Sequence, residues 1–223
     1  MTPNFSVLVA DKHHTQYAGD ICNEMEASAK ARGTGIAKRS PEYIIQKMNE
    51  GKAVIAFAED GTWAGFCYIE SWSHGQYVAN SGLIVAPQFR KSGLAKQIKT
   101  KIFELSRNMY PESKIFGLTT GLAVMKINSD LGYEPVTYSE LTQDDAFWSG
   151  CKSCVNYDIL MGKDRKNCLC TAMLYDPAEQ AAKATPETAK KRLAVLERLS
   201  KLKLYVFLKS LPQLATRTKQ IFL

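Results

Sequence analysis

The sequence predicts a mixed α/β fold in which a mixed central sheet is flanked by helices. Segments with the alternating or apolar pattern of strands are interspersed with segments in which apolar residues recur at helical spacing. The predicted order is β-α-α-β-β-β-α-β-α-β-β. This order combines a central antiparallel meander with a later β-α-β crossover, so parallel and antiparallel strands are expected to share one sheet.

The composition is that of a globular protein with a hydrophobic core, because 45% of the 223 residues are hydrophobic and 23% are charged. No apolar run approaches the roughly 20 residues that a membrane-spanning helix requires. The first residues lack the basic and apolar segments of a secretion signal. We therefore expect a cytoplasmic protein without a membrane span, whose six cysteines are mostly reduced.

The positive charge is concentrated near the C-terminus. From residue 186 onward there are nine Lys and Arg against two acidic residues, which accounts for the whole net charge of +7. We predict a folded domain over residues 1–176 and a basic amphipathic helical extension over residues 177–223. The extension is expected to pack on the domain or against a second copy in a homodimer, and lipid is a further option. A nucleic-acid partner is disfavoured because the domain lacks interleaved aromatic and basic residues.

The N-terminal half begins with a strand over residues 5–9, after which Asp11 can cap a helix. Ser40-Pro41-Glu42 is typical of an N-cap followed by a first-turn proline and acid, and predicts a second helix that ends at Gly51. Between the two helices, residues 31–39 form a loop in which basic residues alternate with glycine.

An antiparallel meander follows the second helix. Residues 52–59 and 62–72 are predicted strands joined by Asp60-Gly61, a strong hairpin signal. His74-Gly75 then turns the chain into a strand over residues 76–85. A long helix begins after Gly93 and stops before Pro111. The remaining predicted elements are a strand at 115–119, a helix at 123–131 with Gly132 as its C-terminal cap, and strands at 134–140 and 155–161.

The turn between strand 76–85 and the long helix has the features of a phosphate-binding site. The first N–H groups of a helix are unpaired, and the helix dipole favours negative charge beside them. Gly93 allows a ligand to approach the backbone, and the spacing matches neither the dinucleotide fingerprint nor the Walker P-loop. The residues assigned to this site are Arg90, Lys91, Ser92, Gly93, Leu94 and Ala95.

The pattern Arg90-x-x-Gly93-x-Ala95 resembles the pyrophosphate loop of the GNAT acyl-CoA N-acyltransferases. The segment 128–133, a short helix that closes on Gly132-Tyr133, resembles the next motif of that family. The resemblance extends over about residues 5–160. It implies the GNAT fold and acetyl-CoA, or another acyl-CoA, as the co-substrate.

The resemblance also implies how the acyl donor binds. In the family the pantetheine arm lies like an extra strand in a cleft between the fourth and fifth strands, here residues 76–85 and 115–119. The backbone of Leu83 and Val85 would then pair with the arm and polarise the thioester carbonyl. Gly82 within the fourth strand is consistent with a bulge that opens such a cleft.

Acyl transfer to an amine needs a base for the amine and an acid for the leaving thiolate. Many family members carry a tyrosine four residues before the closing Gly-Phe or Gly-Tyr, but this position is Asn128. An amide can donate a hydrogen bond to sulfur and cannot supply a proton at neutral pH, so orientation, thiolate stabilisation and a surface role stay open. Glu70 is the nearest carboxylate and the first candidate for the base, with His74 as the second. Both are also compatible with solvent-exposed positions.

The acceptor is expected to carry a carboxylate. In the family the loop between the first two helices lines the acceptor pocket, and here it contains Arg32 and Arg39, whose guanidinium groups suit a carboxylate. A solvated loop is the alternative. Residues 30–43 and 117–128 further resemble stand-alone bacterial acyltransferases associated with arginine biosynthesis, in which glutamate is N-acylated. This resemblance makes glutamate the first candidate acceptor.

Two functions are compatible with these features. The first is an N-acyltransferase that moves an acyl group, acetyl before succinyl, from acyl-CoA to the amine of a small metabolite such as an amino acid. The second is a non-catalytic coenzyme A-binding module that acts on a partner through its basic C-terminal helix. Asn128 at the tyrosine position favours the second, and the arginine-bearing loop favours the first.

Four cysteines form the pairs Cys151-x-x-Cys154 and Cys168-x-Cys170, which suggest zinc, a redox pair or structural thiols. If residues 155–161 and the segment after Cys168 formed a simple hairpin, the two pairs would lie at its opposite ends. At about 3.3 Å per residue the separation would be roughly 20 Å, too far for shared coordination. We therefore expect no metal, although a path other than a hairpin would restore the site.

Overall fold

The computed structural model describes residues 4–33 and 38–183. Residues 184–223 of the predicted basic amphipathic extension, and residues 34–37 of the loop between the first two helices, lie outside the described residues. The chain divides into two compact units, Met1–Pro177 and Ala178–Leu223. The described part of the second unit is the end of helix α7 (Pro177–Lys183).

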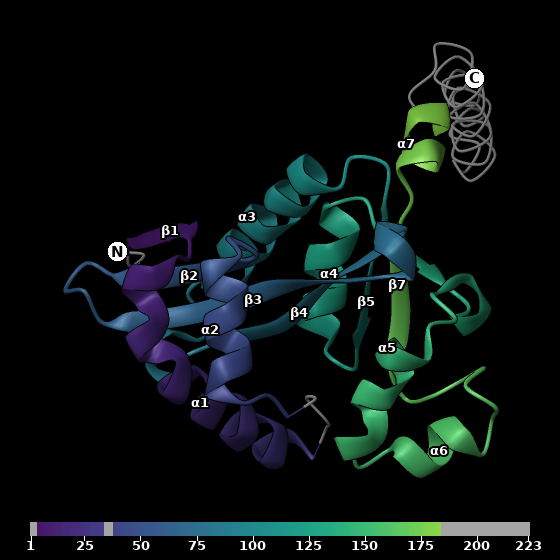
Figure 1. Cartoon of the computed structure of the whole chain (residues 1–223), viewed down its shortest axis with the longest axis horizontal. Coiled ribbons are helices and arrows are strands. Elements are labelled where there is room, and N and C mark those ends of the chain that lie inside the picture. The colour runs from purple at the N-terminus through teal and green to yellow at the C-terminus, as the bar shows by residue number, and fades with distance from the viewer. Residues whose placement is uncertain (1–3, 34–37, 184–223) are drawn as a thin grey trace, which may run out of the picture. The chain divides into compact units, whose positions relative to one another are not determined.

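The first unit contains a seven-stranded mixed sheet with the strand order β1-β2-β3-β4-β5-β7-β6 (Figure 1). β4 and β5 are parallel, and all other neighbouring strands are antiparallel. The strands are β1 (Phe5–Val9), β2 (Ala53–Ala58), β3 (Trp63–Trp72), β4 (Tyr77–Val85), β5 (Lys114–Thr119), β6 (Glu134–Val136) and β7 (Thr171–Tyr175).

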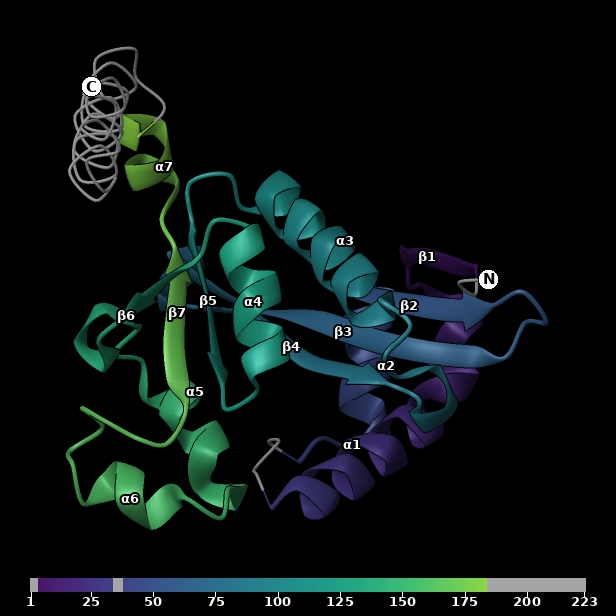
Figure 2. The same cartoon turned by 180° about the vertical axis from the view of Figure 1, so that it is seen from behind.

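Helices cover both faces of this sheet. α1 (Ala18–Arg32) and α2 (Pro41–Asn49) lie on the face seen in Figure 1, and α3 (Leu94–Met109) and α4 (Leu122–Asp130) lie on the face seen in Figure 2. Two short helices, α5 (Asp145–Ser149) and α6 (Tyr157–Met161), follow β6. None of the helices in the described part of the chain has the length and apolar character needed to cross a membrane.

Local sequence signals explain where several elements begin and end. Ser40 is the N-cap of α2 and its side chain accepts a hydrogen bond from the Tyr43 N–H. In the β2–β3 hairpin, Asp60 accepts a bond from the Thr62 N–H at 2.9 Å, and Gly61 has a φ of 81°. These predictions are confirmed. Asp11, however, caps a 3-10 turn over Lys12–Tyr17 that precedes α1, not an α-helix.

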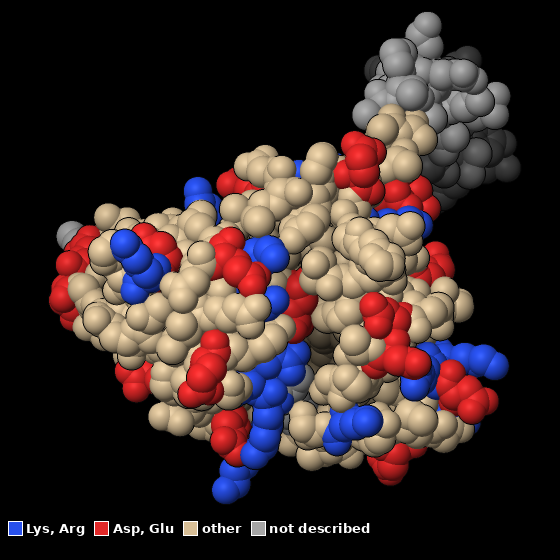
Figure 3. Space-filling model, viewed as in Figure 1, with Lys and Arg blue, Asp and Glu red and all other residues tan. Residues whose placement is uncertain are grey.

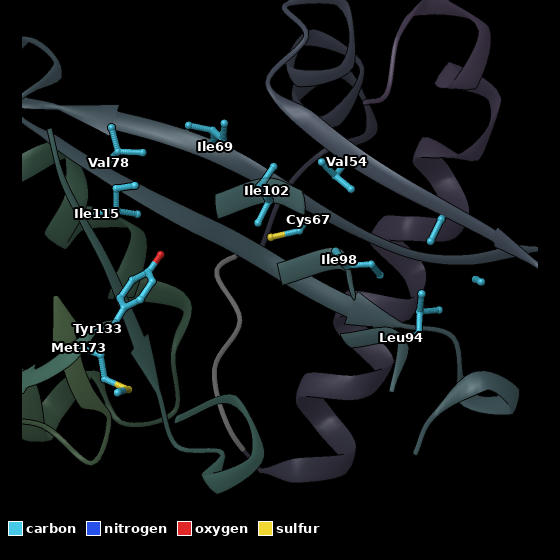
Figure 4. Close-up of a cluster of buried hydrophobic side chains, with 12 residues drawn as sticks. Val54, Cys67, Ile69, Val78, Leu94, Ile98, Ile102, Ile115, Tyr133 and Met173 are labelled. Carbon is cyan, nitrogen blue, oxygen red and sulfur yellow. The ribbon is translucent and has the colours of Figure 1, made fainter. Parts of the chain in front are cut away.

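Side chains that alternate along the strands form two main core layers. The first packs α3 against the sheet and includes Cys67, Ile98 and Ile102, which lie together in Figure 4. The second packs α1 and α2 against the opposite face, with Met25 and Tyr68 among its members. A smaller cluster forms around Trp148 where α5 and α6 approach β5 and β7. The two faces are thus buried by different pairs of helices.

β4 and β5 pair over a short distance and then separate. Their parallel register comprises three residue pairs, from Tyr77 with Lys114 to Ala79 with Phe116. β4 continues to Val85 without further pairing to β5. The predicted splaying of these two strands is therefore confirmed, and it opens a gap in the sheet just beyond Ala79.

Gly82 forms the predicted bulge in β4. The register between β3 and β4 shifts between Phe66 and Tyr68, and Gly82 has a φ of 64°. A Cβ atom at Gly82 would clash with the ring of buried Tyr68 and would lie 2.7 Å from Cε of Met25. The bulge therefore depends on a residue without a side chain.

Gly82→Ala is expected to destabilise the fold by about 2–4 kcal/mol, because it adds a clash in the core to an unfavourable backbone conformation. Urea unfolding should show this loss as a lower midpoint with an unchanged slope. Gly51→Ala is the control, since Gly51 also has a positive φ but its added Cβ would meet nothing within 4 Å. Equal losses for the two variants would contradict a special packing role for Gly82.

The C-terminal part of the domain differs from the prediction. Residues 155–161 were expected to form a strand, but Tyr157–Met161 is the helix α6. Leu160 is buried while Ile159 and Met161 are exposed, so this single helical turn contributes one apolar side chain to the core even though its burial also alternates as in a half-buried strand. The predicted strand at 134–140 is shorter, because Tyr138–Glu140 forms a 3-10 turn.

Candidate active site

A cavity of about 830 Å³ opens where β4 and β5 separate. Its wall includes the bulge residues Gly82 and Leu83, the end of α1, the start of α2, α4 and the segment around α5. Figure 3, which shows the molecule from the same side as Figure 1, shows a hollow with Lys and Arg side chains at its edge. The volume suits a small acceptor together with the reactive end of an acyl donor.

The predicted base Glu70 and the predicted substrate-binding residue Arg39 lie together in this wall. Glu70 is 7% exposed, and its Oε1 lies 3.1 Å from Nη2 of Arg39. The hydroxyl of Tyr43 donates a short hydrogen bond to the same oxygen. Nε of Arg39 also donates to the hydroxyl of Tyr68 at 3.0 Å. Within the described residues no hydrogen bond reaches the other carboxylate oxygen, Oε2, so this oxygen can serve a ligand in the cavity.

This network holds Glu70 as a carboxylate acceptor. Burial and the hydrogen bond to Glu70 raise the pKa of Tyr43 well above its ordinary value, so Tyr43 remains a donor. Burial lowers the pKa of Arg39, but its interactions with Tyr68, Glu70 and Tyr43 outweigh this effect and leave the net shift upward. Sequence reasoning missed Tyr43 and Tyr68. Tyr43 follows the Ser40 cap by three residues and therefore lies in the first turn of α2, beside the basic loop. This position is the sequence signal that could have identified Tyr43.

The other predicted acceptor residue, Arg32, is the last residue of α1 and also lines the cavity. Arg32 is exposed at the rim of the cavity, where partial desolvation and then the positive charge of Arg90 lower its pKa. Two guanidinium groups, those of Arg32 and Arg39, therefore border one cavity. His74, the second candidate base, is exposed in the turn after β3 and is not among the residues that line the cavity.

Asn128 is a buried cavity residue, which excludes the surface role. It is 1% exposed, and its Nδ2 lies 3.7 Å from Sδ of Met173 on β7. Its Oδ1 is buried without a hydrogen-bond partner in the described structure. A buried acceptor that lacks a partner is costly, and a donor group of a ligand in the cavity would satisfy it. The pantetheine arm, with its amide N–H groups, has such donors.

The structure also places a buried lysine at the gap, which sequence reasoning missed. Lys99 of α3 is 2% exposed and lines the cavity. Its Nζ donates to Oδ1 of Asn80, the first β4 residue beyond the paired region, at 3.2 Å. Lys99 lies three residues before the apolar Ile102 and directly after Ile98, so helical spacing alone places its charge on the buried face.

The predicted phosphate loop joins β4 to α3. Gly93 is the N-cap of α3 with a φ of 86° and has no side chain that could cap the helix, while the Leu94 N–H makes a long bond of 3.4 Å to Oγ of Ser92. A Cβ atom at Gly93 would meet nothing within 4 Å, so the backbone is open to a ligand. Ser92 fixes the turn by donating to the Phe89 carbonyl at 2.6 Å. This geometry fits a diphosphate at the start of the 16-residue helix.

The side chain of Arg90, which was expected to bind phosphate, is hydrogen-bonded to other groups of the protein. Its Nη2 donates to Glu24 at 2.6 Å and to Ser28 at 2.7 Å, both on α1. Its Nε donates to the carbonyl of Val85 at 3.2 Å. The Arg90 side chain thus ties the loop to α1. Direct contacts with coenzyme A by the loop residues, and by Leu83 and Val85 in β4, stay predictions.

The cysteine pairs lie closer together than the hairpin argument implied, because α6 replaces the expected strand. The Asn156 N–H donates to Sγ of Cys154 at 3.5 Å, and Sγ of Cys168 donates to the Asn156 carbonyl at 3.8 Å. The separation of roughly 20 Å that argued against zinc is therefore wrong. In the part of the chain that the structure describes, all six cysteines are free thiols. No three Cys, His, Asp or Glu side chains there are arranged as a metal centre.

Comparison with known proteins places this geometry in context. A sequence profile of the acetyltransferase (GNAT) family matches residues 22–121. Thialysine N-epsilon-acetyltransferase from Caenorhabditis elegans is 26% identical over 148 residues, which are 66% of this chain and 90% of that protein.

Two solved structures share the fold. N-acetylglutamate synthase from Neisseria gonorrhoeae, in complex with coenzyme A and N-acetylglutamate, superposes with a TM-score of 0.55 at 15% identity. The match covers 78% of this chain but 35% of that one. Rv2747 from Mycobacterium tuberculosis, in complex with coenzyme A, also gives a TM-score of 0.55 at 15% identity, and the match covers 77% of this chain and 98% of that one.

The chain therefore has the GNAT fold, with a seven-stranded mixed sheet flanked by helices. The family match covers the bulged β4, the phosphate loop and α3, which are the elements that border the gap. Sequence match and fold together identify the class of enzyme as an N-acyltransferase with an acyl-CoA as its co-substrate.

Proposed function

We propose that this acyl-CoA-dependent N-acyltransferase acylates the amine of a small amino acid, with acetyl as the first candidate for the acyl group and glutamate as the first candidate acceptor. The observation that carries the proposal is the cavity wall in which Arg32, Arg39 and the buried Glu70 lie together. Guanidinium groups suit the carboxylate of an amino acid, and a carboxylate base suits its amine.

The residues of the chain divide the work as follows. The guanidinium of Arg32, at the end of α1 in the cavity wall, binds the acceptor carboxylate. Oε2 of Glu70 takes a proton from the acceptor ammonium, directly or through water. Arg39 and Tyr43 hold the Glu70 carboxylate in place through its other oxygen, Oε1. Bound acyl-CoA supplies the thioester. The bulge at Leu83 and the unpartnered Oδ1 of Asn128 orient its pantetheine arm.

A screen of acyl donors against acceptors tests the proposal. Release of coenzyme A thiol would be measured with acetyl-CoA and succinyl-CoA over the common amino acids. We expect turnover with an acidic amino acid above all others. The enzyme proposal fails if coenzyme A binds tightly but no small amine releases thiol, and the non-catalytic module that acts through a partner then takes its place.

Arg32→Gln is expected to raise the KM for the amino acid about tenfold, because one charge-assisted hydrogen bond to the carboxylate is lost. The KM for the decarboxylated amine of the same amino acid should not change. Lys30→Gln is the control, since Lys30 is an exposed residue on the same helix and does not line the cavity. An equal effect on the amino acid and on the amine would show that Arg32 does not bind the carboxylate.

A further inference from the structure

A buried cation, the ammonium of Lys99, borders the gap between β4 and β5. Within the described residues Nζ of Lys99 has a hydrogen bond to Asn80, and no Asp or Glu pairs with it. Its neighbours on the buried face of α3, Ile98 and Ile102, are apolar and fully buried. An ammonium in such a position is costly for the fold, so a purely structural requirement would favour an apolar side chain.

The surrounding hydrogen bonds fix the position of this ammonium. The hydroxyl of Tyr133 donates to Oδ1 of Asn80 at 3.1 Å, and Nδ2 of Asn80 donates to Oγ of Ser106 at 2.7 Å. The amide of Asn80 is thereby oriented with its oxygen toward Lys99. Nζ of Lys99 also lies 5.1 Å from the centre of the Tyr133 ring. The network holds Nζ beside the first residue of β4 that no longer pairs with β5.

The titratable neighbours of Lys99 are neutral near pH 7. Burial raises the pKa of Cys67, on β3, to about 11, so this thiol keeps its proton. Burial also raises the pKa of Tyr133, which follows α4. Burial lowers the pKa of Lys99 itself to about 8. Lys99 is therefore mostly protonated at neutral pH, and it gives up its proton far more readily than an exposed lysine does.

Lys99 and Asn128 line one cavity at the point where the sheet opens. Asn128 stands where related enzymes carry a tyrosine, and its amide has no proton to give at neutral pH. The reaction still requires a proton for the thiolate that leaves. Lys99 lies beside the opening beyond Ala79 and is protonated at neutral pH, so it can supply this proton.

We propose that Lys99 is the catalytic acid of the acyl transfer, with its ammonium donating a proton to the sulfur of coenzyme A as the carbon–sulfur bond breaks. The electron pair of that bond passes to sulfur while the acceptor nitrogen forms the new bond to the acyl carbon. Lys99 is left neutral and regains a proton from those that the acceptor amine releases to Glu70 and water. The position of the sulfur rests on the proposed function, because the gap must hold the pantetheine arm.

The test compares Lys99→Met with Lys101→Met. Lys101 lies on the same helix and is half-buried, but it does not line the cavity. The first measurement is the pKa of the coenzyme A thiol when bound, followed through the ultraviolet absorbance of the thiolate. A nearby ammonium stabilises a thiolate, so this pKa should be lower in the wild type than in Lys99→Met by about one unit or more. Lys101→Met should match the wild type.

The second measurement is steady-state kinetics. Lys99→Met should lower kcat by about 100-fold, the lower range for a general acid, with little change in the KM for acyl-CoA. The variant should also remain folded, because it removes a buried charge, and its Tm at pH 7 should be equal to or above that of the wild type. A low kcat in a protein of undiminished Tm excludes misfolding as the cause.

An unchanged thiol pKa in Lys99→Met would overturn the proposal, even if kcat fell, because a lysine that acts through Asn80 alone would not change the thiol. Wild-type kcat in the variant would also overturn it. The thiol titration needs no acceptor. Failure of every amino acid in the screen would therefore reject the proposed acceptor class and leave the test of Lys99 intact.

Discussion

Glu70→Gln is expected to lower kcat/KM for the amine acceptor by about 10²- to 10⁴-fold, the range that a positioned general base contributes. The glutamine side chain keeps the shape of the carboxylate and can still meet Arg39, but it cannot accept a proton from the acceptor ammonium. The remaining activity should rise with pH, because a larger fraction of the amine is then neutral without help from the protein. Initial rates of thiol release over a pH series measure both effects.

Glu59→Gln is the matched control for this variant. Glu59 is exposed in the turn between β2 and β3 and is not among the residues lining the cavity. It should retain the kinetics of the wild type. The Tm of Glu70→Gln should be recorded in parallel, since Arg39 and Tyr43 lose a charged partner. A folded Glu70→Gln variant with wild-type kcat/KM would remove Glu70 from the mechanism.

Gly93→Val is expected to weaken the binding of coenzyme A by at least about 100-fold, which corresponds to about 2.7 kcal/mol. A β-branched residue is strained at a φ of 86°. Its side chain would also occupy the open space in front of the first N–H groups of α3, where the diphosphate is expected. Isothermal titration with coenzyme A measures the loss directly.

Gly61→Val separates strain from steric exclusion of the ligand. Gly61 has a φ of 81°, and its added Cβ would likewise meet nothing within 4 Å, but it lies in the β2–β3 hairpin. Both variants should lose similar amounts of stability, while Gly61→Val should bind coenzyme A like the wild type. Equal affinities for the two variants would show that the diphosphate does not bind at Gly93.

The features that depend on local chemistry could be predicted from the sequence. Gly82 and Gly93 both have the left-handed backbone that their positions in a bulge and a helix cap require. Ser40 and Asp60 fix a helix start and a hairpin through bonds to residues two or three positions away. In each case the residue acts on its own backbone conformation or on neighbours within three positions in the sequence.

The features that depend on distant contacts could not. The carboxylate of Glu70 meets Arg39 and Tyr43, which are 31 and 27 positions away in the sequence. α6 forms because Leu160 packs into the cluster around Trp148, and this packing outweighs the strand-like composition of the segment. The family resemblance made Arg39 a candidate and Glu70 was the nearest carboxylate to the fourth strand, but nothing in the sequence indicated that the two form an ion pair.

The short pairing of β4 with β5 has a consequence for the choice of acyl group. The three residue pairs from Tyr77–Lys114 to Ala79–Phe116 are the apex of a wedge, and the four strands before β5 and the three strands from β5 onward are its two arms. The width of the wedge at any depth follows from the angle at this apex. We expect larger or smaller side chains at the buried apex residues Val78 and Ile115 to change that angle, and with it the length of acyl chain that fits.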